Sequence, residues 1–256
     1  MTTTISSLGP LRRHAQKRLW KHAFPLEAAL VESLCQNSGQ LTSSGTEAHL
    51  RREWVLGHRI ADVAIYRLEG LPVSDALLRK LTKLGTPELL VLSHFMSGPK
   101  NLMDLHQEVF MREGELEKVV DKLAKAGLVQ LNDSGCFFPS EWVKWVPKDL
   151  HFIEAKIENW REAIEQAKYY QDYADSVSIA LPASFSDRAD VFEACREAGV
   201  GLILVGAQNT TWNVLPSRLA PPLPTPRKTA CLLQILKRHM LDFLNGRPIQ
   251  PATVQG

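Results

Sequence analysis

The chain has 256 residues, of which 45% are hydrophobic, so it can bury one large core or two modest ones. Its formal net charge of +2 excludes a strong overall basic field, so any contact with nucleic acid must come from local basic patches. No apolar run approaches the roughly 18 residues of a membrane span, and the N-terminal region has no signal-peptide pattern. We therefore expect a cytoplasmic protein without membrane contact.

Cysteine usage points to the same compartment. The four cysteines lie far apart and lack the paired CxxC spacing of a zinc site. They are also too sparse for a disulfide scaffold, so we expect buried free thiols in a reducing environment. The residues concerned are Cys35, Cys136, Cys195 and Cys231.

The first part of the chain predicts helices around a β-hairpin. Residues 10–22 alternate basic and apolar side chains, typical of a basic helix that is either solvated or a DNA-contacting arm, and residues 1–24 form this N-terminal unit. A second helix follows Pro25 and ends before Asn37 to Gly39. Residues 53–70 are rich in β-branched side chains around Gly57-His58, which predicts a hairpin, and residues 74–83 predict another helix.

Residues 86–147 have the pattern of an inserted domain. Three predicted helices are followed by a hairpin around residues 132–135, the order of a winged helix-turn-helix. In the third helix one stripe is apolar, and Lys118, Lys122 and Lys125 lie on another face, where they are candidate DNA contacts. Acidic residues on the same helix repel phosphate, so DNA binding and protein interaction both stay open for this module.

The remaining chain predicts an α/β fold. Residues 150–206 alternate strand, helix, strand, helix and strand, and the apolar strands indicate a parallel or mixed sheet with helices on its faces. We assign residues 25–85 and 148–213 to this core domain. Residues 214–256 comprise a stiff proline-rich linker and a terminal amphipathic helix over about 228–245. Thr211-Trp212 indicates no more than an ordered surface segment.

Charged residues in otherwise apolar strands are the candidates for chemistry. The period-2 rule puts Glu154 and Lys156 on the same side of one strand, with Phe152, and burying two charges is costly unless they are used or paired. Asp62 lies in a second apolar run and can meet Glu154 if the two strands are adjacent. Carboxylate oxygens and a nearby cation are what metal-assisted phosphodiester hydrolysis needs.

In this order the motifs resemble the PD-(D/E)XK, or restriction-endonuclease-like, nucleases. Glu154-Ala155-Lys156 matches the (D/E)XK element, and Ala61-Asp62 stands where the family has Pro-Asp, with the proline missing. Gln166 to Tyr170 matches the QxxxY element of the RecB-like branch. The resemblance covers roughly residues 25–70 and 150–206 and implies a restriction-endonuclease-like mixed sheet interrupted by the winged helix.

The resemblance also implies roles. Asp62 and Glu154 would bind Mg2+ or Mn2+ with the carbonyl of Ala155, and Lys156 would assist the attacking water. Gln166 and Tyr170 would line the DNA path. The family often takes a further acidic residue from its first helix, and Glu32 is our choice for it, ahead of Glu47 and Glu53. The implied activity is hydrolysis of DNA in defence, mobile-element processing or repair.

Structural explanations compete with each of these roles. Glu154 and Lys156 could form an ion pair at a sheet edge, and Asp62 could accept a hydrogen bond from Arg59. Gln166 and Tyr170 could be ordinary helix residues, with Tyr169 and Tyr173 in the core. The whole chain could be a noncatalytic DNA-binding or regulatory protein on a nuclease-like scaffold. A homodimer or a partner protein, which the terminal helix would contact, also stays open.

Overall fold

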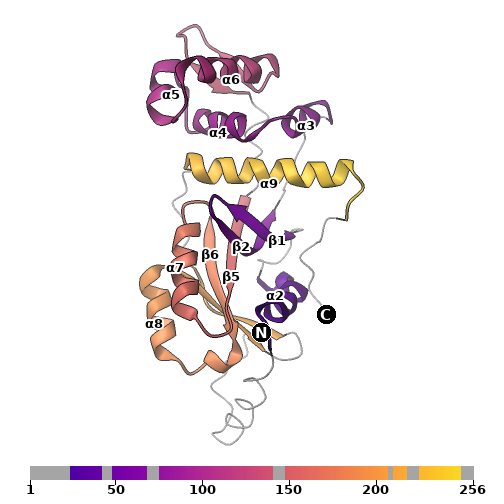
Figure 1. Cartoon of the computed structure of the whole chain (residues 1–256), viewed down its shortest axis with the longest axis vertical. Coiled ribbons are helices and arrows are strands. Elements are labelled where there is room, and N and C mark those ends of the chain that lie inside the picture. The colour runs from indigo at the N-terminus through magenta and orange to yellow at the C-terminus, as the bar shows by residue number, and fades with distance from the viewer. Residues whose placement is uncertain are drawn as a thin grey trace, which may run out of the picture.

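Figure 1 shows the fold as a computed structural model of the whole chain. The residues it describes are 24–41, 48–67, 75–140, 148–206, 210–217 and 225–248. The predicted basic helix over residues 10–22 lies outside them, as does Glu47. None of the described helices is long and apolar enough to cross a membrane.

A six-stranded mixed sheet forms the centre of the larger part of the molecule. Its strand order is β1-β2-β5-β6-β7-β8, so β5 is an interior strand and the predicted core of alternating strands and helices is confirmed as an α/β sheet. Strands β5, β6 and β7 are parallel, whereas β1, β2 and β8 join antiparallel to their neighbours. The strands are β1 (Ala48–Leu56), β2 (Arg59–Arg67), β5 (Lys148–Ala155), β6 (Ser176–Pro182), β7 (Gly201–Gly206) and β8 (Thr210–Leu215).

The hairpin of β1 and β2 follows from its turn. Gly57 has a φ of +60°, a backbone conformation that glycine adopts without cost, and the strands pair from Leu56↔Arg59 outward. The structure confirms the predicted hairpin and starts its first strand earlier, at Ala48. The strand β8 was not predicted, because Thr211 and Trp212 alone gave no period-2 pattern long enough to indicate it.

Helices cover the two faces of this sheet (Figure 1). Helices α7 (Trp160–Tyr170) and α8 (Ala189–Ala198) pack on one face, and α2 (Glu27–Gln36) contacts β2, β5, β6 and β7 on the other. Helix α7 begins where the side chain of Asn159 accepts the backbone N–H of Glu162. It ends at Tyr170, one turn earlier than the four turns we predicted, because a turn follows over residues 171–173.

A second, smaller unit lies at the other end of the molecule. It consists of α3 (Asp75–Thr82), α4 (Thr86–Phe95), α5 (Leu102–Glu108) and α6 (Glu113–Lys125), followed by the hairpin of β3 (Val129–Leu131) and β4 (Phe137–Pro139). Its core includes Leu81 and Leu84, so α3 packs with this unit rather than with the sheet to which we had assigned residues 25–85. The apolar stripe predicted on α6 is buried.

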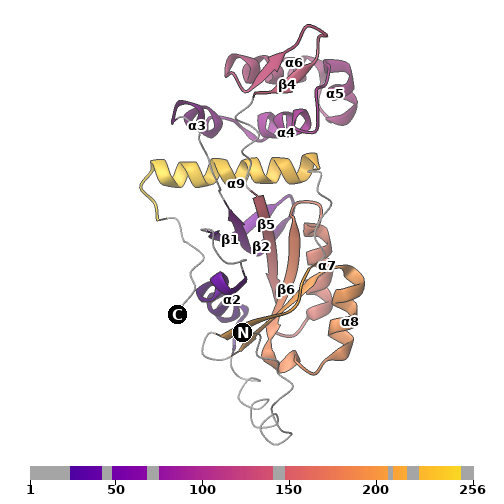
Figure 2. The ribbon, with the colours of Figure 1, turned by 180° about the vertical axis from the view of Figure 1, so that it is seen from behind.

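Helix α9 (Pro226–Leu244) lies between the two units (Figures 1 and 2). One of its faces places Cys231, Leu232 and Ile235 in the core beside the sheet, and another places Leu233 and Met240 in the core of the smaller unit. These two buried faces join the two units. Contact of this helix with a partner protein stays a prediction.

The cysteines are free, as predicted. Cys35, Cys195 and Cys231 are buried, and burial raises the pKa of each of these thiols. Cys136 is only half-buried, so the prediction of burial was wrong for that residue, which follows the exposed turn of the small hairpin.

Candidate active site

The strands that carry the candidate residues are neighbours. Strands β2 and β5 pair through Val63↔Ile153 and Ala64↔Phe152, and continuing this register by one residue sets Asp62 opposite Glu154. The inserted unit separates them in the chain, but the sheet brings them together. Glu154 and Lys156 are therefore not at a sheet edge, as one alternative explanation required.

The carboxylate of Asp62 bridges the two strands. Its Oδ2 atom accepts the backbone N–H of Ala155 at 2.7 Å, and no hydrogen bond from Arg59 to Asp62 is seen. Burial raises the pKa of this carboxyl, and the Ala155 N–H and the Lys156 ammonium offset that effect in part. Asp62 is thus a carboxylate held in a fixed direction at the end of β5.

Glu154 is 2% exposed, which is unusual for a charged residue. Its Oε1 atom lies 3.1 Å from the ammonium of Lys156, and its Oε2 atom accepts the hydroxyl of Tyr170 at 2.9 Å. Burial, and secondly the negative charge of Asp62, raise the pKa of Glu154 to about 7. Two carboxylates that repel each other in a buried setting are the feature that a bound cation would relieve.

Lys156 follows the last residue of β5 and stays on the side of Glu154, as predicted. Its side chain is 15% exposed and lies 3.4 Å from a carboxylate oxygen of Glu27. Burial acts to lower the pKa of Lys156, but Glu154, Glu27 and Asp62 outweigh it and raise the pKa. The side chain is therefore an ammonium at neutral pH and can stabilise negative charge, but it cannot take up a proton.

The acidic residue of the first helix that contacts Lys156 is Glu27, and Glu32 lies elsewhere. Glu32 forms an ion pair with Arg52 at 2.7 Å and accepts a hydrogen bond from Gln36, which directs its carboxylate away from Lys156. The helix begins at Glu27, which places this residue of its first turn beside Lys156, whereas Glu32 pairs with Arg52 of β1. An acidic residue in a first turn is common in helices, so the sequence gave no distinctive signal.

Glu53, our reserve choice, is near the site. The β1–β2 register sets it opposite Asp62, and its negative charge contributes to the raised pKa of that residue. Its φ of +53° is a left-handed conformation that is uncommon for a glutamate. Such backbone conformations cluster at functional sites, so the observation favours a role beyond pairing.

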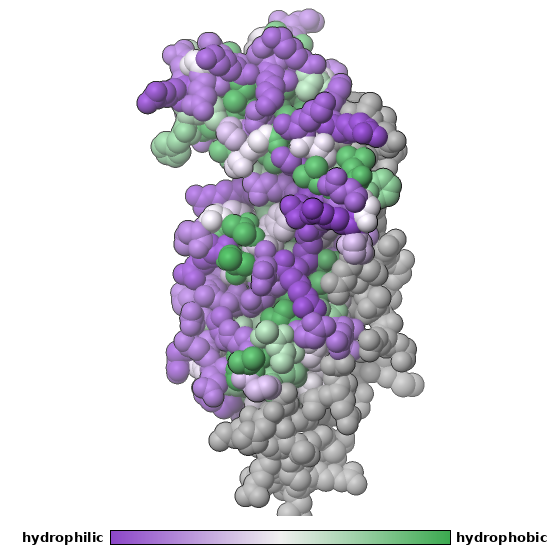
Figure 3. All heavy atoms as spheres, turned by 45° about the vertical axis from the view of Figure 1, so that its right-hand side comes forward, coloured by the Kyte–Doolittle hydropathy of each residue, from purple (hydrophilic) through white to green (hydrophobic). Residues whose placement is uncertain are grey.

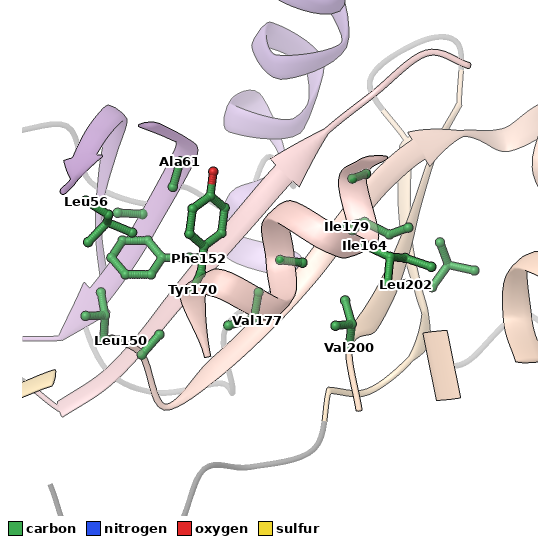
Figure 4. Packing of buried hydrophobic residues seen from close by; sticks show 14 of the residues in the cluster. Leu56, Ala61, Leu150, Phe152, Ile164, Tyr170, Val177, Ile179, Val200 and Leu202 are labelled. Carbon is green, nitrogen blue, oxygen red and sulfur yellow. The ribbon is translucent and has the colours of Figure 1, made fainter. Parts of the chain in front are cut away.

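Tyr170 and Gln166 lie one turn apart on α7 and differ in setting. Tyr170 is 1% exposed and packs against Phe152, with ring centroids 6.0 Å apart, in the cluster drawn in Figure 4. Its hydroxyl donates to Glu154 and also lies 2.8 Å from the carbonyl of Ile60. Tyr170 therefore presents no surface to DNA in this structure, and its hydroxyl contacts Glu154 instead. Gln166 donates to Glu162, and its Oε1 atom is buried without a partner.

The three lysines of α6 are not equivalent. Lys122 pairs with Glu88 of α4, and Lys125 pairs with Asp121 at 2.6 Å on its own helix. Lys118 is exposed and has no ion pair among the residues that the structure describes. In Figure 3 hydrophilic side chains dominate the visible surface of this unit. Among the described residues, Lys118 is the one of the three predicted DNA contacts that has no acidic partner.

The donor set limits what metal this site could hold. Within the described ranges, no group of three or more histidine, cysteine, aspartate or glutamate side chains is arranged to hold an ion. Asp62 and Glu154 supply two carboxylates, and Mg2+ is commonly held by one or two carboxylates with waters and substrate phosphates completing its shell. The residues present fit that kind of site and do not form a closed cage of protein ligands.

Comparisons with models of protein families, with curated proteins and with solved structures found no significant match. The resemblance to the nucleases thus rests on the sequence motifs.

Proposed function

We propose that the chain is a metal-dependent nuclease that hydrolyses phosphodiester bonds of DNA. The observation that carries the proposal is the buried Glu154, held by Tyr170 and Lys156 on an interior strand beside the carboxylate of Asp62. An ion pair of Glu154 and Lys156 with a purely structural role would not need the second carboxylate of Asp62, whose charge raises the pKa of Glu154. Perturbed carboxyls of this kind, next to a cation, are typical of functional sites.

In this proposal Asp62 and Glu154 hold Mg2+ or Mn2+, with the carbonyl of Ala155 as a further oxygen ligand. When bound, the ion would polarise a phosphoryl oxygen and lower the pKa of a coordinated water. Lys156 stabilises the negative charge that develops on the phosphate and orients the attacking water. Tyr170 fixes the direction of Glu154 by its hydrogen bond, and Glu27 holds the ammonium of Lys156 from the other side.

The finer fold assignments belong to the same proposal. The larger unit is a restriction-endonuclease-like domain, and the unit of α4, α5, α6 and the small hairpin is a winged helix inserted between β2 and β5. Lys118 is the DNA contact on its third helix. A homodimer or a partner protein would complete the DNA-binding surface, since the chain carries a net charge of only +2.

Cleavage assays on matched variants test the activity. Linear, circular and single-stranded DNA, with RNA beside them, are incubated with Mg2+ or Mn2+ and with wild type, Asp62→Asn or Lys156→Gln. Glu165→Gln is the control, because Glu165 is exposed on α7 and its one ion pair within the described ranges is with Lys168. We expect metal-dependent cleavage that both site variants lose and the control keeps. No cleavage by the wild type, or cleavage unchanged in both site variants, would overturn the proposal.

A noncatalytic DNA-binding or regulatory protein is the second candidate. The small number of metal donors favours this candidate. Asp62 and Glu154 supply two carboxylates, and the described residues contain no group of three ligands that could hold an ion. It predicts DNA binding that persists without cleavage in every metal. Binding of Mn2+ without turnover would instead indicate a catalytic subunit that needs a partner for activation.

A further inference from the structure

A polar pocket opens on the sheet face that α2 covers, away from Tyr170 and Glu154. Its volume is about 270 Å3, close to the lower end of the roughly 300–1,000 Å3 range of small-molecule sites. Farther along the same face, Ile153, Ala155 and Ala180 belong to an apolar cluster. At the pocket the strands instead supply Arg67, His151, Ser178 and Asn213. A sheet face that changes from apolar to polar at a cavity needs an explanation.

His151 and Ser178 line this pocket side by side. The Nε2 atom of His151 lies 2.9 Å from the Ser178 hydroxyl, and burial lowers the pKa of the imidazole to about 4, so it is neutral. Its Nδ1 atom has no hydrogen-bond partner among the described residues. Gly201 makes room for this pair, since a side chain there would come within 2.3 Å of the Ser178 hydroxyl oxygen. The glycine thus keeps a serine at a position where a larger residue would displace it.

Backbone irregularities flank the pocket on two sides. The β2–β5 register shifts beyond Ile65, where Asp149 adopts a φ of +56° that is uncommon outside glycine. The β7–β8 register shifts beside Asn213, which places an extra residue in β8. Bulges re-aim side chains and are over-represented next to functional sites, and left-handed non-glycine residues cluster there too. Both irregularities direct polar residues to the same cavity.

The positive charge of Arg67 indicates which kind of ligand the pocket would bind. Arg67 is 13% exposed on its side chain and lies 3.4 Å from a carboxylate oxygen of Asp149, which is 63% exposed at the rim. A guanidinium presents a fork of donors that suits a carboxylate or a phosphate, and Asp149 is exposed enough at the rim for its contact with Arg67 to exchange. Asp149 therefore occupies one of the positions that the acidic group of a ligand would take on Arg67.

We propose that this pocket, lined by Arg67, His151, Ser178 and Asn213, binds a small organic molecule through a carboxylate or phosphate group. The acidic group is held by Arg67 in place of Asp149. The neutral imidazole, the hydroxyl and the amide bond its polar atoms, and Ile65 and Pro216 contact its apolar part. The site lies on the opposite face of the sheet from Glu154, so it is independent of the proposed nuclease activity.

Calorimetric titration of the full chain at neutral pH tests this site with four probes. Inorganic phosphate and adenosine monophosphate carry the phosphate group, succinate carries the carboxylate, and adenosine is the neutral control. We expect at least one anion to bind while adenosine does not, and the tighter anion identifies the source of the acidic group. Binding of none of the anions, or equal binding of adenosine and adenosine monophosphate, would overturn the proposal.

Two variants with opposite expected effects on anion binding distinguish a lost contact from misfolding. Arg67→Gln should weaken anion binding about tenfold or more, because the charged donor is lost. Asp149→Asn should tighten it, because the competing carboxylate is removed. Arg188→Gln is the matched control, since Arg188 pairs with Asp190 on the surface. Thermal unfolding checks that each variant is folded. Unchanged affinity in both Arg67→Gln and Asp149→Asn would show that the anion binds elsewhere, and would overturn the assignment.

Discussion

The carboxylate of Asp62 accepts the backbone N–H of Ala155 at 2.7 Å and so joins β2 to the last residue of β5. This contact gives Asp62 two roles, one in holding the strands together and one in placing a negative charge beside Glu154. A substitution at this residue must therefore separate the hydrogen bond from the charge before its effect on any activity has a meaning.

Two substitutions of Asp62 achieve that separation. Asp62→Ala leaves the N–H of Ala155 without its acceptor, and we expect a loss of about 1–3 kcal/mol in the free energy of unfolding. Asp62→Asn keeps an acceptor oxygen and removes a buried charge, so its stability should stay near that of the wild type. Urea denaturation measures both. If Asp62→Asn is as unstable as Asp62→Ala, the charge itself stabilises the fold, and the contact with Ala155 does not explain the residue.

Glu154 predicts how stability changes with pH. Its pKa is raised from 4.5 to about 7 in the folded chain, so the folded state binds more protons than the unfolded state between these values. Stability should therefore fall as pH rises from about 4.5 to 7, by an amount on the order of 1–3 kcal/mol, and the cost persists above that window. Urea denaturation across this range measures it. Glu154→Gln should flatten the decline, and an equal slope in that variant would assign the effect to other groups.

A bound divalent cation should also change how stability depends on pH. Mg2+ or Mn2+ between Asp62 and Glu154 favours their ionised forms, so the ion should raise the melting temperature more at pH 8 than at pH 5. Differential scanning calorimetry with and without Mn2+ measures the shift without any substrate. Glu154→Gln should lose most of the shift, whereas Glu32→Gln should keep it because Glu32 pairs with Arg52. A shift lost in Glu32→Gln would instead indicate that Glu32 contributes to the ion site.

The sequence predicted the β1–β2 hairpin and the alternating strands and helices well, because their patterns are local. The period-2 rule also placed Glu154 and Lys156 on one side of β5. The sequence could not show which residues of segments far apart in the chain lie beside each other. The choice between Glu27 and Glu32 depends on which residue of α2 lies beside Lys156, and the burial of Tyr170 depends on how α7 packs on the sheet. Neither is encoded in any short motif.

The pocket beside His151 shows the same limit. Its residues come from four strands, and single histidines or serines in β-rich segments are ordinary. The bulges that direct these residues together are visible only once the strands are paired. A sequence pattern therefore finds a site that lies along one strand more readily than one assembled across a sheet.

Substitution of Tyr170 should change the pH dependence of the proposed cleavage rather than abolish it. The Tyr170 hydroxyl donates to the carboxylate of Glu154 and so acts to lower the pKa of that residue. Tyr170→Phe should raise this pKa further and destabilise the fold by about 1–3 kcal/mol. Any cleavage that needs ionised Glu154 should then shift to higher pH, which a pH–rate profile measures. Tyr173→Phe, which loses only a bond to Tyr169, is the control, and equal profiles in both variants would count against positioning by Tyr170.

A substitution of Lys118 tests whether α6 contacts DNA. The charge of Lys118 is free of ion pairs within the described part of the chain, whereas Lys122 contributes to packing by its pair with Glu88 and Lys125 pairs within its own helix. Lys118→Ala should weaken binding to duplex DNA and reduce the slope of log affinity against log salt by about 0.9, the value for one lost phosphate contact. Fluorescence anisotropy over a salt series measures this, with Lys125→Ala as the matched control. Lys122→Ala should mainly lower stability, because Glu88 also accepts the N–H of Gly85 and would lose its cation. An unchanged slope in Lys118→Ala would leave α6 as a face for protein contacts, which its acidic residues favour.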